Sequence, residues 1–436
     1  MIRIGIVLHI FIASNILFGQ GDWFFSRLAD LPEPVTENSL CEFETSGNNK
    51  FVYSFGGISN PVDYTSFHGK VFKYHVSANS WETIGEFSSL SGRIGMMVVN
   101  VNNRIFLIGG KELQADSSFT TVGDVTVYNP FLDTLEVNSN PIPIPVENAV
   151  TSVWKDSLIL VVSGKSSDSI TSAVQVFNPS FNAWQQATPV PDELGFKVEG
   201  ASGFILGDTI FYYGGSGGTI LPNISNSLIR GEINPDDPLD ISWSRVPNFT
   251  ILPSYRSICS GHADKLFWLG GTTVRHDFQG NNSFFQNPIM PNTRMVNLNL
   301  SQNSNQVQDF EIPFAKMASN TAAKLGGGNW LVCGGLDSLQ QASNVVYLMT
   351  NFSYSDMDQA LHPPTFNVLE FDEYYKIVTE NIGNVLVADA SGRVHFNERK
   401  QLADLVIPKY RLQKGFLIFI YNDGSNVPVS VKKILH

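Results

Sequence analysis

The sequence predicts an all-β fold made of six copies of one structural unit. Three observations support this: a recurring glycine pair, a composition rich in turn-forming and aromatic residues, and the absence of long stretches with helical spacing of apolar residues. The chain has 436 residues, of which 43% are hydrophobic and 16% charged, so it can bury a large core. Its 36 glycines, 22 prolines and 12% aromatic residues are typical of many short strands joined by turns.

A glycine pair ends each of six short apolar runs, and in one copy serine replaces the first glycine. The pairs are Gly56-Gly57, Gly109-Gly110, Ser163-Gly164, Gly214-Gly215, Gly270-Gly271 and Gly334-Gly335. Their spacing of about 50 to 65 residues matches the length of one four-stranded propeller blade. Paired glycines let the backbone turn sharply and approach neighbouring chains closely. The repeat therefore predicts a β-propeller of six blades.

An aromatic residue followed by a tryptophan seven positions later marks the outer half of a unit. Tyr74 precedes Trp81 in the first unit, and Phe177 precedes Trp184 in the third. In the second unit leucine replaces the tryptophan, and in the fourth a longer turn leads to Trp243. One further apolar segment precedes each glycine pair, which gives four strands per unit.

The sixth unit lacks an outer strand of its own, because no tryptophan follows Tyr347. Near the start of the chain, the segment DWFFSRLADLP resembles an unpaired outer strand, with Trp23 in the tryptophan position. We expect this strand to complete the sixth blade. It would close the ring and remove the open seam that unpaired strand edges would leave.

With these features, the chain resembles the kelch-repeat β-propellers over about residues 22–354. The resemblance rests on the glycine pairs, the aromatic-to-tryptophan spacing and the apolar strands between them. It is most specific in the first and third units. It implies a six-bladed kelch-type propeller, which we expect to span residues 22–358.

The first residues resemble a signal peptide. Arg3 is followed by an apolar run from Ile4 to Phe18, which is shorter than the roughly 20 residues of a membrane span. The small residues Gly19 and Gly21 have the spacing of a signal peptidase site. We expect residues 1–21 to be removed and the mature chain to have no transmembrane span; a buried N-terminal strand is the alternative.

The last residues, 365–436, follow a linker at His362-Pro363-Pro364 and contain no glycine pair at the end of an apolar run. Their alternating strands predict a small β-sandwich. The runs that carry a further resemblance are VLVADASGRV at Val385 to Val394, LQKGFLIFI at Leu412 to Ile420, and VKKIL at Val431 to Leu435. They resemble the C-terminal sorting domain of the Bacteroidota type IX secretion system. This implies that the type IX machinery is a partner and that the protein is secreted or held on the outer cell surface. An ordinary accessory β-domain is the alternative.

Charge and cysteine usage exclude several classes of function. The formal net charge is -12 and the pI is near 5.1, so nucleic acid or an anionic membrane would repel the chain. Cys41, Cys259 and Cys333 lack metal-ligand spacing and lie in or beside apolar runs, which predicts buried free thiols. We expect no metal and no cofactor.

Kelch proteins often bind through residues just before the innermost strand of each blade. Carried over by position, these candidate residues are Glu37, Arg93, Glu147 with Asn148, Lys197 with Glu199, Arg256 and Lys316. Of these, Arg93, Lys197, Glu199, Arg256 and Lys316 are the predicted ligand-binding residues. Such a ring would either clamp a carboxylate or sugar acid or form a solvated rim of ion pairs.

The sequence favours a secreted or surface-displayed binding or scaffold protein with an unknown protein or glycan ligand, rather than an enzyme. The alternative is a carbohydrate-modifying enzyme such as a sialic-acid mutarotase or epimerase. In that case Glu199 would serve as the base and Arg256 would hold the sugar carboxylate. Hydrolase and nucleotide-binding motifs are absent, and the histidines show no grouping typical of a copper oxidase. No catalytic residue is therefore assigned.

Overall fold

We describe the protein from a computed structural model. Up to residue 351 it describes residues 18–351 except 21–22, 47–48, 137–138, 219–222, 248, 250, 301–305 and 319–320. Beyond that it describes residues 367–370, 374–378, 383–389, 394–400, 405–409, 412, 416–422 and 430–435. Most of the expected signal peptide and the expected linker therefore lie outside the described residues. No helix among the described residues is long and apolar enough to cross a membrane.

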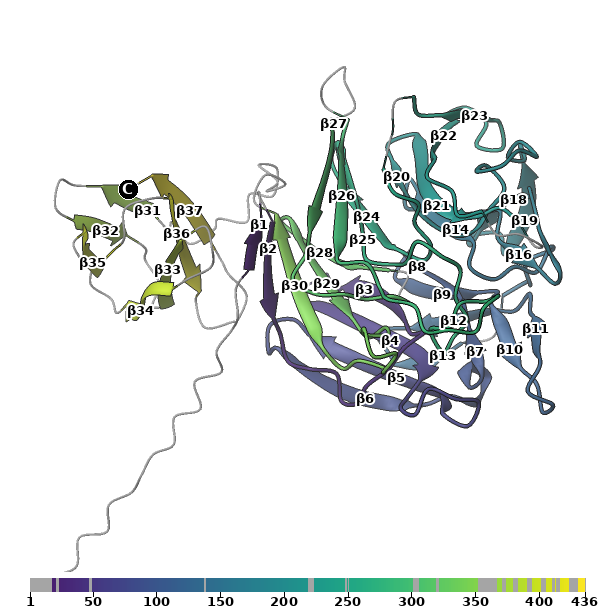
Figure 1. Ribbon diagram of the computed structural model, residues 1–436, viewed down its shortest axis with the longest axis horizontal. Coiled ribbons are helices and arrows are strands. Elements are labelled where there is room, and N and C mark those ends of the chain that lie inside the picture. The colour runs from purple at the N-terminus through teal and green to yellow at the C-terminus, as the bar shows by residue number, and fades with distance from the viewer. Residues whose placement is uncertain are drawn as a thin grey trace, which may run out of the picture.

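Six antiparallel sheets form a six-bladed propeller, as the sequence predicts (Figure 1). The first blade contains β3 (Ser39–Glu44), β4 (Lys50–Ile58), β5 (Phe67–His75) and β6 (Ser80–Glu86). The second contains β8 (Met97–Val101), β9 (Arg104–Ile108), β12 (Val125–Asn129) and β13 (Thr134–Leu135). The third contains β14 (Val150–Trp154), β15 (Leu158–Val162), β18 (Val174–Asn178) and β19 (Ala183–Ala187). The fourth blade contains β20 (Glu199–Leu206), β21 (Thr209–Ser216), β22 (Leu228–Ile233) and β23 (Ile241–Arg245). The fifth contains β24 (Ile258–His262), β25 (Lys265–Leu269), β26 (Arg294–Asn299) and β27 (Gln306–Glu311).

Short elements extend the loops on one side of the blades. β7 (Arg93–Ile94), β10 (Lys111–Leu113) and β11 (Phe119–Thr121) form one small sheet, and β16 (Lys165–Ser166) and β17 (Ser169–Ile170) form another. A single 3-10 turn, η1 (Ser88–Leu90), completes the described elements of the first two blades. Apolar side chains fill the spaces between neighbouring blades, and all three cysteines are buried free thiols, as predicted.

The sixth blade is closed by the N-terminal strand, which confirms the predicted closure. Its strand order is β2 (Trp23–Arg27), β30 (Val346–Asn351), β29 (Asn329–Cys333) and β28 (Ala323–Gly326), and β1 (Phe18–Gln20) pairs with the outer edge of β2. The described end of the expected signal peptide is thus a strand. Because the first and last strands of the propeller share one sheet, the ring has no open seam.

The register within this blade differs from the prediction that Trp23 takes the tryptophan position. Phe25 lies opposite Met349, the pairing that Trp184 makes with Phe177 in the third blade. Trp23 lies two residues away and is buried against the neighbouring blade, with its ring 5.1 Å from that of Phe267. The sequence pattern identified the strand correctly but placed its aromatic residues two positions out of register.

The glycine pairs join each blade to the next through the backbone. The second glycine donates its N–H to a carbonyl of the following blade, over 2.8 Å for Gly110 to Val146, 2.9 Å for Gly164 to Val198, 2.7 Å for Gly215 to Ser254 and 2.9 Å for Gly271 to Lys316. A Cβ atom on Gly109 would lie 2.4 Å from the carbonyl oxygen of Val146, too close for any side chain. The repeat that predicts the fold is therefore also the contact between blades.

One residue near the start of each inner strand adopts a left-handed backbone conformation. These six residues, here called the mouth ring, are Glu37, Gly95, Asn148, Gly200, Arg256 and Ala318, with φ of 59°, 65°, 51°, 67°, 53° and 57°. Four of them donate their N–H to the ring residue of the preceding blade, Glu37 to Ala318, Asn148 to Gly95, Gly200 to Asn148 and Arg256 to Gly200. Only two of the six are glycine, so the hydrogen bonds between blades maintain a conformation that the other residue types rarely adopt.

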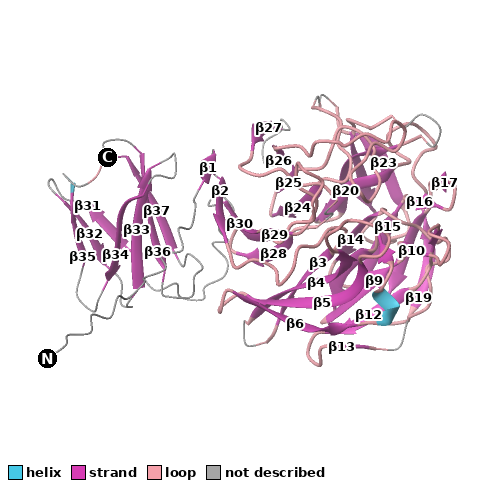
Figure 2. Cartoon of the chain, turned by 60° about the horizontal axis from the view of Figure 1, so that its bottom comes forward, coloured by secondary structure: helices cyan, strands magenta, loops and turns pink. Residues whose placement is uncertain are grey.

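The C-terminal residues form two further antiparallel sheets (Figure 2). One contains β31 (Asn367–Glu370), β32 (Tyr374–Val378) and β35 (Leu405–Pro408), and the other contains β34 (Val394–Lys400), β33 (Gly383–Asp389), β36 (Phe416–Asn422) and β37 (Ser430–Leu435). Tyr375 and Ile377 of the first sheet share a buried cluster with Val385 and Val387 of the second. This confirms the predicted small β-sandwich.

Replacing the buried tryptophan of the closing strand tests the closure. Trp23→Ala is expected to lower the free energy of unfolding of the propeller by about 3–5 kcal/mol, because it leaves a cavity between two blades. Urea unfolding followed by tryptophan fluorescence measures the change. Phe181→Ala is the control: this ring is 79% exposed, and its loss should change stability by less than about 0.5 kcal/mol. Equal effects of the two substitutions would contradict the closure.

Candidate functional site

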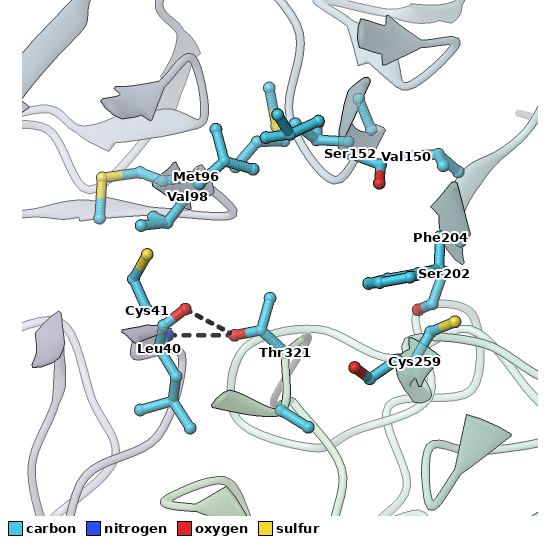
Figure 3. Close-up of a pocket in the computed structure, with 18 of the residues that line it drawn as sticks. Leu40, Cys41, Met96, Val98, Val150, Ser152, Ser202, Phe204, Cys259 and Thr321 are labelled. Carbon is cyan, nitrogen blue, oxygen red and sulfur yellow. Dashed lines mark hydrogen bonds between the residues drawn. The ribbon is translucent and has the colours of Figure 1, made fainter. Parts of the chain in front are cut away.

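Two cavities lie along the channel that the inner strands enclose. The first, here called the channel cavity, has a volume of about 270 Å³. Figure 3 shows the side chains of Met96, Val98, Val150, Phe204 and Thr321 arranged around its open space. Its walls are largely apolar or hydroxyl-bearing, and Glu42 is their one carboxylate among the described residues. Nowhere in the described part of the chain do three or more histidine, cysteine or acidic residues gather to hold a metal ion.

The second cavity, here called the mouth cavity, lies at the mouth ring and has a volume of about 130 Å³. It is the charged part of the channel. Its ionisable wall residues come from five of the six blades and are Glu37, Lys111, Glu147, Lys165, Glu199, Tyr255, Arg256, Arg275, His276 and Asp277. This concentration of buried charge identifies the mouth cavity as the candidate functional site.

Glu37 and Arg256 form a two-pronged ion pair across the cavity wall. Both guanidinium Nη atoms donate to the two carboxylate oxygens over 2.5 Å, and both side chains are buried. Burial alone would lower the pKa of Arg256, but the carboxylate of Glu37 outweighs it and raises the pKa. The pair joins the first blade to the fifth and leaves the guanidinium committed to Glu37.

Glu147 lies between two lysines. Its carboxylate oxygens are 3.2 Å from Nζ of Lys111 and 3.4 Å from Nζ of Lys165, and one of them also accepts from Nδ2 of Asn148. Burial would raise the pKa of Glu147, but the two ammonium groups outweigh it and lower the pKa. Glu147 is therefore ionised near neutral pH.

Glu199 pairs with Arg275, with 2.6 Å between Oε1 and Nη2. The carboxylate and the guanidinium form an ion pair, but Oε1 of Glu199 accepts no hydrogen bond. Burial raises the pKa of Glu199, and Arg275 only partly opposes it. Burial also raises the pKa of the neighbouring Tyr255, whose phenol is therefore neutral. Glu199 thus has a weaker preference for its ionised form than Glu147.

A long loop between β25 and β26, residues 272–293, covers the mouth and carries Arg275 and His276. Its Phe278 packs on aromatic rings of the first two blades, 5.1 Å from Tyr64 and 5.8 Å from Phe119 between ring centroids. These contacts anchor a loop of the fifth blade on the opposite side of the ring. The loop thereby forms part of the cavity wall.

His276 contributes a neutral imidazole to the cavity. It is only 4% exposed, and burial, reinforced by the positive charge of Arg256, lowers its pKa to about 4. Nδ1 lies 2.9 Å from the carbonyl oxygen of Asp277, which can only accept, so Nδ1 carries the proton and donates. Nε2 is then an acceptor, and it has no hydrogen-bond partner. Nε2 of His276 is therefore a hydrogen-bond acceptor of the cavity wall that receives no hydrogen bond.

The structure brings together five of the residues that the sequence singles out and separates three. Glu37, Glu147, Asn148, Glu199 and Arg256 all line the mouth cavity. The other three, Arg93, Lys197 and Lys316, are not among its lining residues. The eight occupy different positions relative to the mouth ring, because sequence counting cannot locate the left-handed residue of each blade.

The three remaining predicted residues have other contacts. Arg93 donates to carbonyl oxygens of its own blade, over 2.7 Å to Gly109 and 2.6 Å to Asp124, and burial lowers its pKa to about 10. Lys316 likewise donates to backbone carbonyls, and burial lowers its pKa to about 8. Lys197 pairs with the exposed Asp192. These contacts stabilise loops and do not face the cavity.

The sequence analysis missed six of the ionisable residues that line the cavity, which are Lys111, Lys165, Tyr255, Arg275, His276 and Asp277. Two of them had a signal, because Lys111 and Lys165 directly follow the glycine pairs of their blades. Arg275, His276 and Asp277 lie in the loop that lengthens the fifth unit, and the wide spacing between the last two glycine pairs indicated an insertion there. Tyr255 had no signal of its own.

The fold is shared with a solved protein. YjhT, a kelch propeller, matches 76% of this chain and 98% of its own, with a TM-score of 0.58 and 14% sequence identity. At this identity the likeness shows the fold alone, and it confirms the predicted kelch-type propeller. No family model matches the sequence, and no curated protein matches it either.

The neutral His276 predicts a pH dependence of stability. Its folded-state pKa of about 4 lies below the ordinary 6.5, so between these values the unfolded chain binds the extra proton and stability falls as pH falls. The loss should reach roughly 3 kcal/mol by pH 4. Urea unfolding between pH 4 and 7 measures it. His276→Asn, which retains an N–H for the Asp277 carbonyl, should lose this part of the pH dependence; an unchanged profile would contradict the assignment.

Proposed function

We propose that this protein is an exported binding protein whose kelch propeller holds a small polar ligand in the mouth cavity. One observation carries the proposal: the cavity wall is built from charged side chains that are paired with each other, yet a buried imidazole nitrogen in it has no partner. Paired charges hold their positions without a ligand and so form a preorganised wall. A ligand group that donates a hydrogen bond would satisfy the unpartnered nitrogen.

Binding fits this wall better than acid–base catalysis. A general base needs a free lone pair and a pKa near the working pH. Glu147 is held ionised by two lysines, and Glu37 is engaged by Arg256 through both oxygens. Neither carboxylate has the freedom that proton transfer requires.

A sugar mutarotase or epimerase is the competing function, and His276 is the observation that favours it. Its neutral Nε2 is an unprotonated base inside a cavity, beside a glutamate of raised pKa. The clamp for a sugar carboxylate is the weak point. Arg256, which the sequence suggested for that task, is bound to Glu37 through both Nη atoms.

Anomer exchange of a sialic acid separates the two functions. We expect the purified full chain to leave the exchange rate of N-acetylneuraminic acid unchanged, because the cavity offers no uncommitted cation for its carboxylate. NMR exchange spectroscopy measures the rate against buffer alone. Acceleration by the wild-type chain that His276→Asn abolishes would replace the binding proposal with the enzymatic one.

Export through the type IX secretion system is the second part of the proposal. It is supported by the resemblance of residues 365–436 to the sorting domain and by the β-sandwich that their described residues form. The type IX machinery is then a partner. The mature chain would be secreted or held on the outer cell surface, after loss of the signal peptide.

Removal of the C-terminal domain tests the export route. In a bacterium that has the type IX system, a chain without residues 365–436 should accumulate in the periplasm, while the full chain reaches the surface or medium. Cell fractionation and immunoblotting measure the distribution, and protease resistance of the retained propeller checks that it has folded. Normal amounts of the truncated chain outside the cell would disprove the sorting role.

A further inference from the structure

Two buried hydrogen-bond acceptors in the wall of the mouth cavity have no partner, and a third accepts no hydrogen bond. The first two are Nε2 of His276 and Oδ1 of Asn148. The third is Oε1 of Glu199, which lies 2.6 Å from Nη2 of Arg275 in an ion pair. The three residues come from three blades and line one cavity. A buried acceptor without a partner is destabilising, so native proteins rarely leave several of them together.

The chemistry of all three atoms is determined by their neighbours. The carbonyl of Asp277 requires the proton of His276 to be on Nδ1, which leaves Nε2 as a lone pair. Asn148 must turn its NH₂ toward the carboxylate of Glu147, which only accepts, so its oxygen faces the cavity. A carboxylate oxygen of Glu199 can only accept. The missing partner is therefore a donor of hydrogen bonds.

The charge of the wall indicates a neutral donor. The four cations, Lys111, Lys165, Arg256 and Arg275, face three glutamates and Asp277, so the formal charges balance. Each cation has a carboxylate within 3.4 Å, and Asp277 accepts from two backbone N–H groups of its own loop. The cavity has no net negative charge to attract an ammonium ligand. An anionic ligand would lie next to hydrogen-bond acceptors instead of donors.

We propose that the mouth cavity binds a neutral polyhydroxyl group, such as the hydroxyls of a monosaccharide, which donate to His276, Asn148 and Glu199. This deepens the proposed binding function, on which it rests, and names the ligand class. The size agrees: one water needs only about 10–15 Å³ of such space, and the cavity has about 130 Å³. Several hydroxyl groups therefore fit at once.

Calorimetric titration of the full chain with four monosaccharides tests the ligand class. D-Galactose and D-glucose are the neutral probes, N-acetylneuraminic acid is the anionic probe, and D-glucosamine is the cationic one. We expect at least one neutral sugar to bind more tightly than both charged probes. His276→Asn should weaken that binding about 3- to 10-fold, the effect of one lost hydrogen bond.

Two further variants separate a binding role from a structural one. His276→Gln, whose amide oxygen reaches the position of Nε2, should bind more tightly than His276→Asn. Phe285→Ser, on the same loop but 83% exposed, should bind like the wild type.

Each outcome decides the proposal. Binding of a neutral sugar that His276→Asn weakens and His276→Gln restores supports it. Tighter binding of a charged probe, no binding of any probe, or binding that is indifferent to His276 overturns it. The binding function itself fails only if a wider screen of glycans and proteins on the full chain finds no ligand, so the two failures are distinguishable.

Discussion

The propeller depends on hydrogen bonds that pass from blade to blade around the channel mouth. Each involves backbone that few residue types tolerate, either the glycine pair or the left-handed residue of the mouth ring. Gly271, for example, donates to the carbonyl of Lys316 in the next blade, at a point where a Cβ atom would collide. The closing strand makes this chain of contacts continuous, because it ties the first residues of the propeller to its last blade.

The same constraint creates the candidate site. Glu37, Asn148 and Arg256 each hold the left-handed position of their blade, and all three line the mouth cavity although they are far apart in the sequence. Unpaired charge would be costly at this buried position, and each of the three glutamates is paired with at least one cation from another element. Backbone geometry thus determines where charge is buried, and burial in turn determines the pairing.

The sequence predicts the features that repeat in every blade. It does not predict features for which a shift of one or two residues along a strand matters. Glycine pairs indicated six blades because both positions of every copy have a positive φ, which favours glycine. The ring residue has no such signature, since the positions equivalent to Glu37 hold glycine, asparagine, arginine or alanine. Counting back from the inner strand therefore mixed cavity residues such as Arg256 with Arg93, which binds backbone carbonyls. Trp23 and Phe25 show the same limit, because two aromatic residues fit the strand pattern equally well.

The mouth cavity depends on the long loop of the fifth blade as well as on the repeated blades. Residues that only this loop supplies, Arg275 and His276, complete the ion pair of Glu199 and add the neutral acceptor. Their position depends on Phe278, which is anchored among aromatic residues of the first and second blades. A shorter loop would leave the mouth open to water, which would screen the charges and satisfy the acceptors. The insertion therefore adds a wall over what would otherwise be a solvated rim of ion pairs, one of the two possibilities that the sequence left open.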